Sequence, residues 1–249
     1  MSGLGVLQNV LVFATVDEAA HALADRIVLL SHEKERAAIA LSGGSTPQRL
    51  YRLLASDVYR AKIDWTHLHW FWGDERFVPI DHTDSNMRMA REAMLDHAPA
   101  PRENIHLVPT DAANENEAAA LYEQELKSFY GGGGLDPARP LFDINLLGIG
   151  EDGHTASLFP GKPAIEERSR WVVGVPEAGL TPFVPRVTLT LPAIASSRHV
   201  AFMAAGKGKR AILARIADGA DFPAAQVRCV GDVLWYLDAA AAPIENGNR

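Results

Sequence analysis

Residues 37–55, AAIALSGGSTPQRLYRLLA, decide how this chain is expected to fold. The segment Ala37–Leu41 is a short apolar run, which is typical of a buried strand, and the stretch from Pro47 onward favours a helix. A turn of glycine and hydroxyl residues, SGGST (42–46), joins the two. A strand that leads directly into a helix in this way is the first part of a βαβ unit.

Working outward from this segment, the same alternation continues along the chain. Strands are predicted at 10–13, 37–41, 68–72, 105–108, 142–147, 171–175, 186–191, 199–204 and 233–237, and helices at 16–30, 47–55, 86–96, 115–129 and 207–217. We therefore predict an α/β fold with a mostly parallel sheet flanked by helices, in a single domain over residues 1–249. Residues Gly131–Gly134 are either a linker between halves or a surface loop, and the strand pattern that resumes after them favours the loop.

Charge and composition exclude several classes of protein. The chain has 24 Lys and Arg against 31 Asp and Glu, a formal net charge of −7, and 47% hydrophobic residues. This acidic balance disfavours nucleic acid and anionic lipid as partners. The single cysteine, Cys229, has no partner for an internal disulfide, and no signal peptide or membrane span is visible. We expect a cytoplasmic protein.

The loop after the strand at 37–41 has the composition of an anion site. Gly43 and Gly44 let backbone N–H groups approach a ligand, and Ser45 and Thr46 add hydroxyls at the positive end of a helix. Thr46 is expected to cap that helix, with Pro47 at its first position. The alternative is a tight turn that needs glycine for its backbone conformation alone.

A second polar loop, Gly73–Pro79, follows the strand at 68–72. Its Arg76 is suited to a phosphate or an oxyanion. A solvated loop with a local Asp–Arg pair is the competing interpretation.

The third loop, GIGEDGHT (148–155), formally contains the G-x-G-x-x-G pattern of dinucleotide sites. We reject that interpretation because Glu151 and Asp152 would repel a pyrophosphate inside the turn. A histidine beside a carboxylate, His154 with Asp152, suits general acid–base chemistry better, since the ordinary histidine pKa is ~6.5. The alternative is a loop histidine satisfied by backbone groups.

Two basic positions remain, and no metal site is predicted. Arg186 begins a strand after Pro185. Lys207 and Lys209 lie at the start of the helix predicted over 207–217, where positive charge opposes the helix dipole and indicates an anion. A solvated basic turn is the alternative. His67 and His69 alternate on one expected strand, but no third ligand accompanies them.

Taken together, these loops resemble the 6-phosphogluconolactonases. The resemblance is carried, over essentially the whole chain and in the family's order, by LSGGSTP (41–47), WGDERFVP (72–79), DSN (84–86), GIGEDGHTASLFP (148–160), PRVTLT (185–190) and GKGK (206–209). It implies a Rossmann-like sheet and hydrolysis of 6-phospho-D-glucono-1,5-lactone, in the oxidative pentose phosphate pathway, without a cofactor. The implied catalytic residues are His154, Asp152 and Arg76, and the implied phosphate-binding residues are Gly43, Gly44, Ser45, Thr46, Arg186 and Lys209. The role of Lys207 stays open.

Two other functions compete with this one. The glucosamine-6-phosphate deaminases share the GGSTP loop, but their pattern has an acidic residue before the proline where this chain has Phe159. A non-catalytic sugar-phosphate sensor is disfavoured because His154, Asp152 and Arg76 are all present. The expected partner is a small phosphorylated lactone. The oligomeric state stays open, and a monomer is compatible with the sequence.

Overall fold

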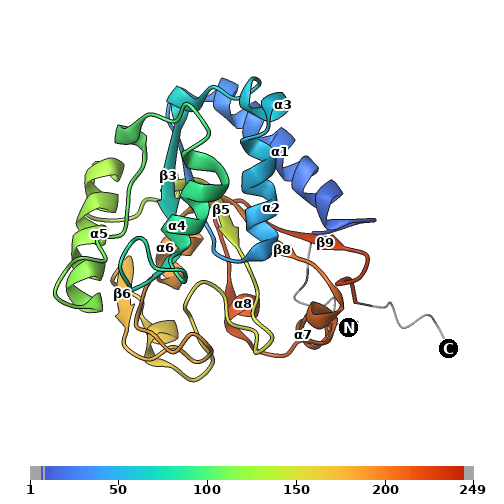
Figure 1. Ribbon diagram of the computed structural model, residues 1–249. Coiled ribbons are helices and arrows are strands. Elements are labelled where there is room, and N and C mark those ends of the chain that lie inside the picture. The colour runs from blue at the N-terminus through green and yellow to red at the C-terminus, as the bar shows by residue number, and fades with distance from the viewer. Residues whose placement is uncertain (1–6, 8, 244–249) are drawn as a thin grey trace.

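Six strands form one parallel sheet in the order β1-β9-β8-β5-β2-β3 (Figure 1). The computed structural model describes residues 7 and 9–243. The strands are β1 (Val10–Phe13), β2 (Ala37–Leu41), β3 (Leu68–Trp72), β5 (Phe142–Leu147), β8 (Ser197–Ala204) and β9 (Asp232–Asp238). Every neighbouring pair in this sheet is parallel, which confirms the predicted α/β architecture.

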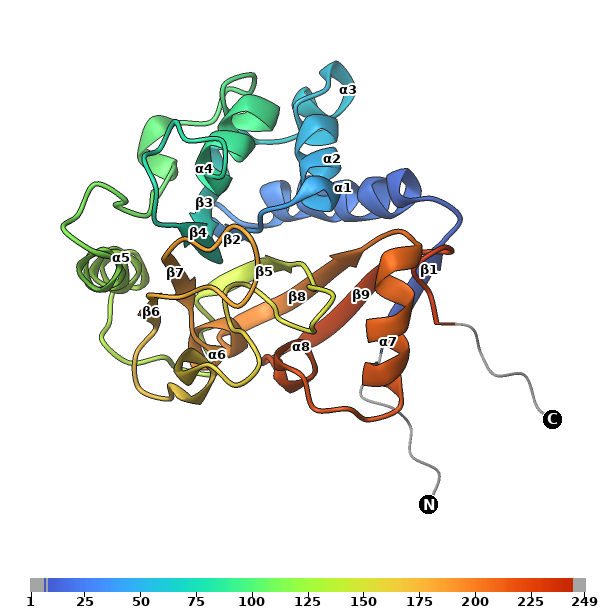
Figure 2. The ribbon, with the colours of Figure 1, turned by 60° about the horizontal axis from the view of Figure 1, so that its bottom comes forward.

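Helices cover both faces of the parallel sheet (Figure 2). One face carries α1 (Val16–Glu33) and α2 (Ser45–Leu54), and the other carries α6 (Leu191–Ala195), α7 (Arg210–Ala217) and α8 (Pro223–Gln226). The chain moves one way across the sheet from β1 to β3 and back again from β5 to β9. Because crossovers between parallel strands are right-handed, the two directions place their helices on opposite faces.

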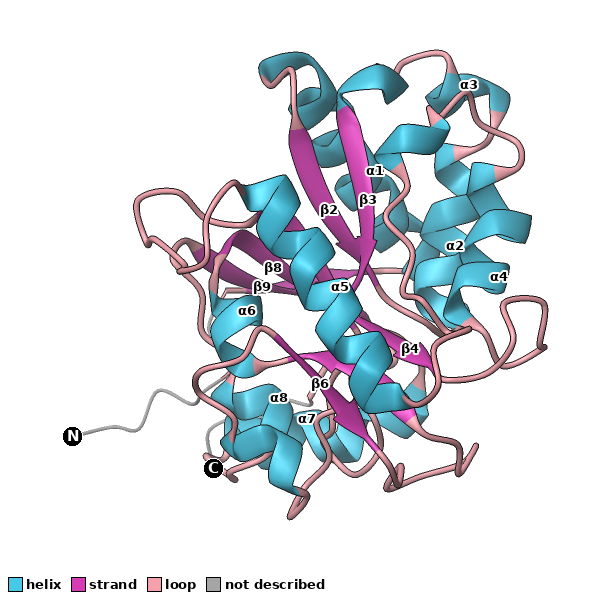
Figure 3. Ribbon diagram, turned by 90° about the vertical axis from the view of Figure 1, so that its left-hand side faces the viewer, coloured by secondary structure: helices cyan, strands magenta, loops and turns pink. Residues whose placement is uncertain are grey.

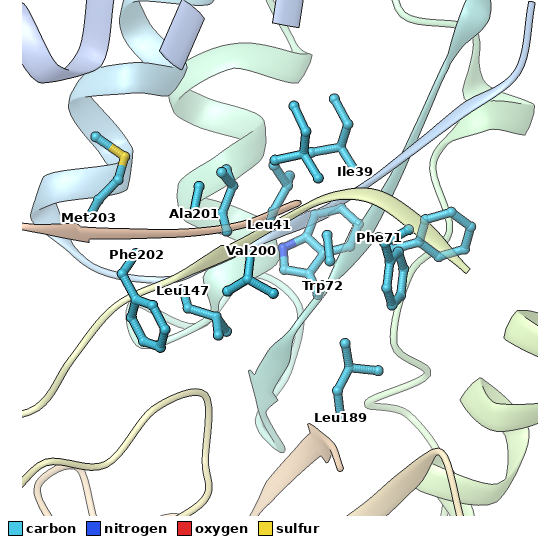
Figure 4. Packing of buried hydrophobic residues seen from close by; sticks show 14 of the residues in the cluster. Ile39, Leu41, Phe71, Trp72, Leu147, Leu189, Val200, Ala201, Phe202 and Met203 are labelled. Carbon is cyan, nitrogen blue, oxygen red and sulfur yellow. The ribbon is translucent and has the colours of Figure 1, made fainter. Parts of the chain in front are cut away.

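The core extends over both faces of the sheet (Figure 4). In β8, Ala201 and Met203 point to one face while Val200 and Phe202 point to the other, and all four are buried. A strand that is covered on both faces needs apolar residues at consecutive positions. This is why β2 and residues 200–204 of β8 are continuous apolar runs. β5 is also buried throughout, but it includes the polar residues Asp143 and Asn145.

A second, antiparallel sheet lies beside α5 (Glu115–Tyr130) (Figure 3). Its strands are β4 (Asp74–Arg76), β7 (Arg186–Leu189) and β6 (Val172–Val175), in the order β4-β7-β6. The chain passes from one sheet to the other at Gly73, whose N–H donates to Leu41 O (2.8 Å) and whose carbonyl accepts from Leu189 N (2.8 Å).

This small sheet corrects three predictions. The segments 171–175 and 186–191 are strands, as predicted, but they lie outside the parallel sheet, because strand periodicity does not reveal which strand is the partner. The segment predicted as a polar loop contains β4, whose charged residues conceal a strand. β7 also ends earlier than predicted, at Leu189, because α6 begins at Leu191 with Pro192 in its first turn.

Other local predictions need smaller corrections. Residues 105–108 form no strand. They make one isolated bridge, between Ile105 and Trp70 of β3, and Pro109 follows them directly. The helix predicted over 86–96 is α4 (Asn86–Ala90) continued by a π-helical stretch, Arg91–Leu95. The helix predicted over 207–217 begins with a 3-10 turn, Lys207–Lys209, before α7. Two other helices are only one turn long, α3 (Asp57–Arg60) and α8 (Pro223–Gln226).

The glycine run Gly131–Gly134 is a surface loop rather than a linker between halves. Gly131 ends α5 in the left-handed conformation (φ 74°), which glycine adopts without strain. The next strand, β5, returns to the centre of the parallel sheet, between β8 and β2.

Candidate active site

A pocket of about 210 Å³ opens where the carboxyl ends of β2 and β5 meet the small sheet. Ligands of open α/β sheets bind at this edge. The pocket is lined by Ser42, Gly43 and Gly44 after β2, by Gly148, Ile149, Gly150, His154 and Ala156 after β5, by Asp74, Arg76 and Arg186 of the small sheet, and by Asn86 and Lys209. Segments that are far apart in the sequence therefore converge on one cavity.

His154 and Asp152 form a close pair at the end of β5. Asp152 Oδ1 lies 2.6 Å from His154 Nδ1 and also accepts the His154 backbone N–H at 3.1 Å. A carboxylate that accepts from Nδ1–H selects the tautomer in which Nε2 carries the free lone pair. The imidazole also packs against the Phe159 ring, with centroids 4.6 Å apart, so the orientation of the ring is fixed.

Glycine is required at two positions of the pocket for reasons of space. A Cβ at Gly150 would lie 2.0 Å from His154 Nδ1, and a Cβ at Gly43 would lie 2.1 Å from Asn86 Oδ1. The glycine pattern at 148–153 thus has a packing explanation in which Gly150 makes room for the histidine ring. No dinucleotide is needed to account for it.

Two arginines lie side by side on adjacent strands of the small sheet. Arg76 and Arg186 are direct partners in the β4–β7 register, where like charges repel. Burial lowers the pKa of Arg186, while the nearby Asp74 carboxylate acts in the opposite direction. An anion that binds in the pocket would offset this repulsion.

Each of these arginines is held by backbone carbonyls. Arg186 donates from Nη2 to Pro182 O (2.8 Å) and from Nε to Val184 O (3.3 Å), and Arg76 donates from Nη1 to Asp84 O (2.7 Å). Within the described residues, Arg186 Nη1 and Arg76 Nη2 make no hydrogen bond. These groups remain available to a ligand.

Sequence reasoning missed the contacts that join the histidine loop to the small sheet. Ser157 Oγ donates to Asp74 Oδ2 (2.7 Å), and Ser157 N donates to Thr188 Oγ1 (3.1 Å). Ser157 belongs to the segment that carries the family resemblance, but its serine gave no chemical signal by itself. Asn86 also lines the pocket and is buried.

The glycine loop differs from the prediction in its helix cap. Gly44, with φ 103°, is the N-cap of α2, so the prediction that Thr46 caps the helix is wrong. No side chain caps this helix, because the chain is already helical at Ser45. Gly43 and Gly44 line the pocket, whereas Ser45 and Thr46 are not among its lining residues. Their place in the phosphate site stays a prediction.

The part of the chain that the structure describes contains no group of three or more His, Cys, Asp or Glu side chains arranged to hold a metal ion. His67 lies in a 3-10 turn before β3, so the prediction that it shares a strand with His69 is wrong. His69 Nδ1 instead lies 3.0 Å from His106 Nε2. Among the described helices, none is both long enough and apolar enough to cross a membrane.

A family model described as glucosamine-6-phosphate isomerases/6-phosphogluconolactonase matches residues 13–235. The chain belongs to this family. It is 42% identical over 231 residues to the 6-phosphogluconolactonase of Synechocystis sp., covering 91% of this chain and 92% of that relative. The 6-phosphogluconolactonase of Mycobacterium tuberculosis is 42% identical over 214 residues, covering 83% and 84% of the two chains.

Solved structures agree with this family assignment. The 6-phosphogluconolactonase from Trypanosoma cruzi superimposes with a TM-score of 0.81 at 34% identity, covering 95% of this chain and 96% of that chain. A monomeric glucosamine-6-phosphate deaminase superimposes with a TM-score of 0.78 at 22% identity, covering 94% and 98% of the two chains, which is a likeness of fold alone.

Proposed function

We propose that this chain hydrolyses 6-phospho-D-glucono-1,5-lactone to 6-phospho-D-gluconate, in the oxidative pentose phosphate pathway. The observation that carries the proposal is the His154–Asp152 pair, 2.6 Å between Nδ1 and Oδ1, at the rim of a pocket that also contains Arg76, Arg186 and Lys209. The relatives and structures named 6-phosphogluconolactonase support it.

In the proposed mechanism, His154 is the general base. Neutral Nε2 takes a proton from water while the water oxygen forms a bond to C1 of the lactone. Asp152 stabilises the imidazolium that results, because its carboxylate accepts from Nδ1–H. The imidazolium then returns the proton to the ring oxygen as the bond from that oxygen to C1 breaks, which leaves the carboxylic acid product.

The phosphate is held away from C1. The Gly43–Thr46 loop offers backbone N–H groups at the start of α2, and Lys209 and Arg186 add positive charge on other sides of the pocket. Binding energy from this remote group positions the carbonyl against the water. Arg76 contacts the substrate, and its free Nη2 is one of the donors suited to the tetrahedral oxyanion.

A deaminase is disfavoured by the surroundings of His154. Where the deaminase pattern has an acidic residue before the proline, Phe159 is buried and packs on the imidazole ring. An apolar ring at this place offers no group for proton transfer.

The test is a lactonase assay on freshly generated phosphogluconolactone, with the spontaneous rate subtracted. We expect enzyme-dependent hydrolysis, and no release of ammonia from glucosamine-6-phosphate. A protein that is thermally stabilised by 6-phosphogluconate but shows no turnover would be the sensor, and the hydrolase proposal would then be wrong.

A further inference from the structure

Glu75 is the middle residue of β4, between two residues that line the pocket. Because side chains alternate along a strand, it lies on the face opposite to Asp74 and Arg76. Its side chain is fully buried, with 0% exposure. Buried carboxylates are normally paired with a cation, but no ion pair of the described residues includes Glu75.

Hydrogen-bond donors surround this carboxylate instead. Oε1 accepts the backbone N–H groups of Arg76 and Asn86, both at 2.7 Å. Oε2 accepts the backbone N–H of Met87 at 2.7 Å and the Ser85 hydroxyl at 3.3 Å. A glutamine side chain at this position replaces one of the two acceptor oxygens by an NH₂ donor, which leaves the donors on that side without an acceptor.

The donors lie at both ends of the loop 77–85 and include the backbone of two pocket residues. Arg76 precedes the loop and donates from Nη1 to Asp84 O (2.7 Å). Asn86 follows the loop, donates from Nδ2 to Asp74 O (2.9 Å) and packs against Gly43. One carboxylate therefore joins the segment that carries Arg76 to the segment that carries Asn86.

We propose that Glu75 is a positioning residue for the hydrolysis, which holds the backbone of Arg76 and Asn86 so that the Arg76 guanidinium stays at the pocket. The inference rests on the proposed function. Glu75 itself lies behind the strand and touches no substrate. Its contribution therefore passes through Arg76, which makes the two residues energetically coupled.

A matched control exists elsewhere in the chain. Glu123 is also a buried carboxylate, 7% exposed, and it accepts the backbone N–H groups of Trp171 (3.0 Å) and Val172 (3.2 Å). It lies in α5 and does not line the pocket. Unlike Glu75, Glu123 also forms ion pairs with Lys127 and Arg170. Glu123→Gln thus removes a buried acceptor of backbone N–H groups, and two ion pairs in addition, at a place that does not line the pocket.

The experiment measures kcat and KM for the parent, Glu75→Gln, Glu123→Gln, Arg76→Ala and Glu75→Gln/Arg76→Ala, each corrected for the folded fraction. A small displacement of a positioned group costs up to ~100-fold, so we expect Glu75→Gln to lower kcat/KM by about 10-fold to 100-fold. That loss should be divided between kcat and KM as it is in Arg76→Ala. Glu123→Gln should stay near the parent, and Glu75→Gln should add little in the Arg76→Ala background.

A Glu75→Gln variant with the parent's kcat/KM, or full additivity with Arg76→Ala, would overturn the positioning role. If Glu75→Gln does not fold, Glu75→Asp replaces it, with the same criteria. Calorimetric affinity for 6-phosphogluconate is measured in every variant. If the parent protein shows no turnover, the proposed function is wrong. The coupling between Glu75 and Arg76 is then tested separately, from the affinities of the variants for 6-phosphogluconate.

Discussion

The two sheets supply the pocket with different kinds of group. The parallel sheet contributes turns at its carboxyl edge, namely the glycine loop after β2 and the His154–Asp152 pair after β5. The antiparallel sheet contributes side chains from within its strands, Arg76 and Arg186. The His154 side chain is partly exposed (23%), whereas Arg186 is buried, with 4% of the whole residue exposed. The proposed general base thus stays near water, while the proposed phosphate-binding cation is held where water screens it least.

The largest expected effect is that of His154→Asn, in the loop after β5, which should slow proton transfer without weakening binding. His154→Asn removes the titrating nitrogen at similar size, and loss of a general base costs about 10²–10⁴ in kcat. Product affinity should change little, because the phosphate is held elsewhere. The check is kcat on a folded sample after subtraction of spontaneous hydrolysis. A value within a few-fold of the parent would assign the base to another group, and Asp74 or Asp152 would be tested next.

Removal of a positive charge that binds the phosphate should show the opposite pattern, a change in KM rather than in kcat. Lys209→Ala should raise KM with little change in kcat, at a cost of about 1–3 kcal/mol for a lost charged hydrogen bond. Lys207 does not line the pocket, so Lys207→Ala is the matched control. Equal KM values for Lys209→Ala and the parent would remove Lys209 from the site.

A smaller effect concerns the small sheet and pH. Burial raises the pKa of Glu75 from its ordinary value of 4.5 to about 7. The folded state then binds this proton more tightly than the unfolded state, so the contribution of Glu75 to stability increases as pH falls from about 7 to 4.5. The Asp74 carboxylate raises this pKa further, while the backbone N–H groups of Asn86, Met87 and Arg76 lower it. Arg186 in β7 and Tyr122 in α5 are other titratable groups that interact with Glu75.

Urea denaturation of the parent and Glu75→Gln at pH 7.5 and 5.5 checks this sign. Other carboxyl groups have lowered pKa values, such as Glu167 at about 2, and act in the opposite direction, but they do so equally in both proteins. The parent should therefore gain stability relative to the variant at the lower pH. A relative loss would mean that the carboxylate is stabilised in its charged form.

The smallest expected effect is that of chelation. The proposed chemistry uses His154, Asp152 and arginine side chains, so dialysis against EDTA should leave kcat/KM unchanged. A large loss that an added metal ion restores would contradict the cofactor-free mechanism.

Sequence patterns predicted the parallel sheet because its strands are predominantly apolar, and three of them, β1, β2 and β8, are followed closely by a helix. They also placed His154 beside Asp152, since two residues separated by one glycine in a turn lie close together. These features are local in the chain.

The features that sequence reasoning missed depend on partners far away in the chain. β4 is a three-residue strand of charged residues, and only its pairing with β7 makes it a strand. The opposition of Arg76 to Arg186 and the Ser157–Asp74 contact likewise join segments that no spacing relates. Gly44 displaced Thr46 as the helix cap because the backbone there turns at the glycine.

The pairing of β1 with β9 constrains the order in which the strands can pair while the chain is being synthesised. β1 has β9 as its neighbour in the sheet, and β9 is the last strand that the structure describes. On the ribosome, β1 emerges before the other described strands and must wait for β9, while β2, β3 and β5 can already pair with one another. Because β9 lies between β1 and β8, a chain that terminates before β9 loses two strand interfaces together. Such a chain would expose an open edge of β8, which is a template for aggregation.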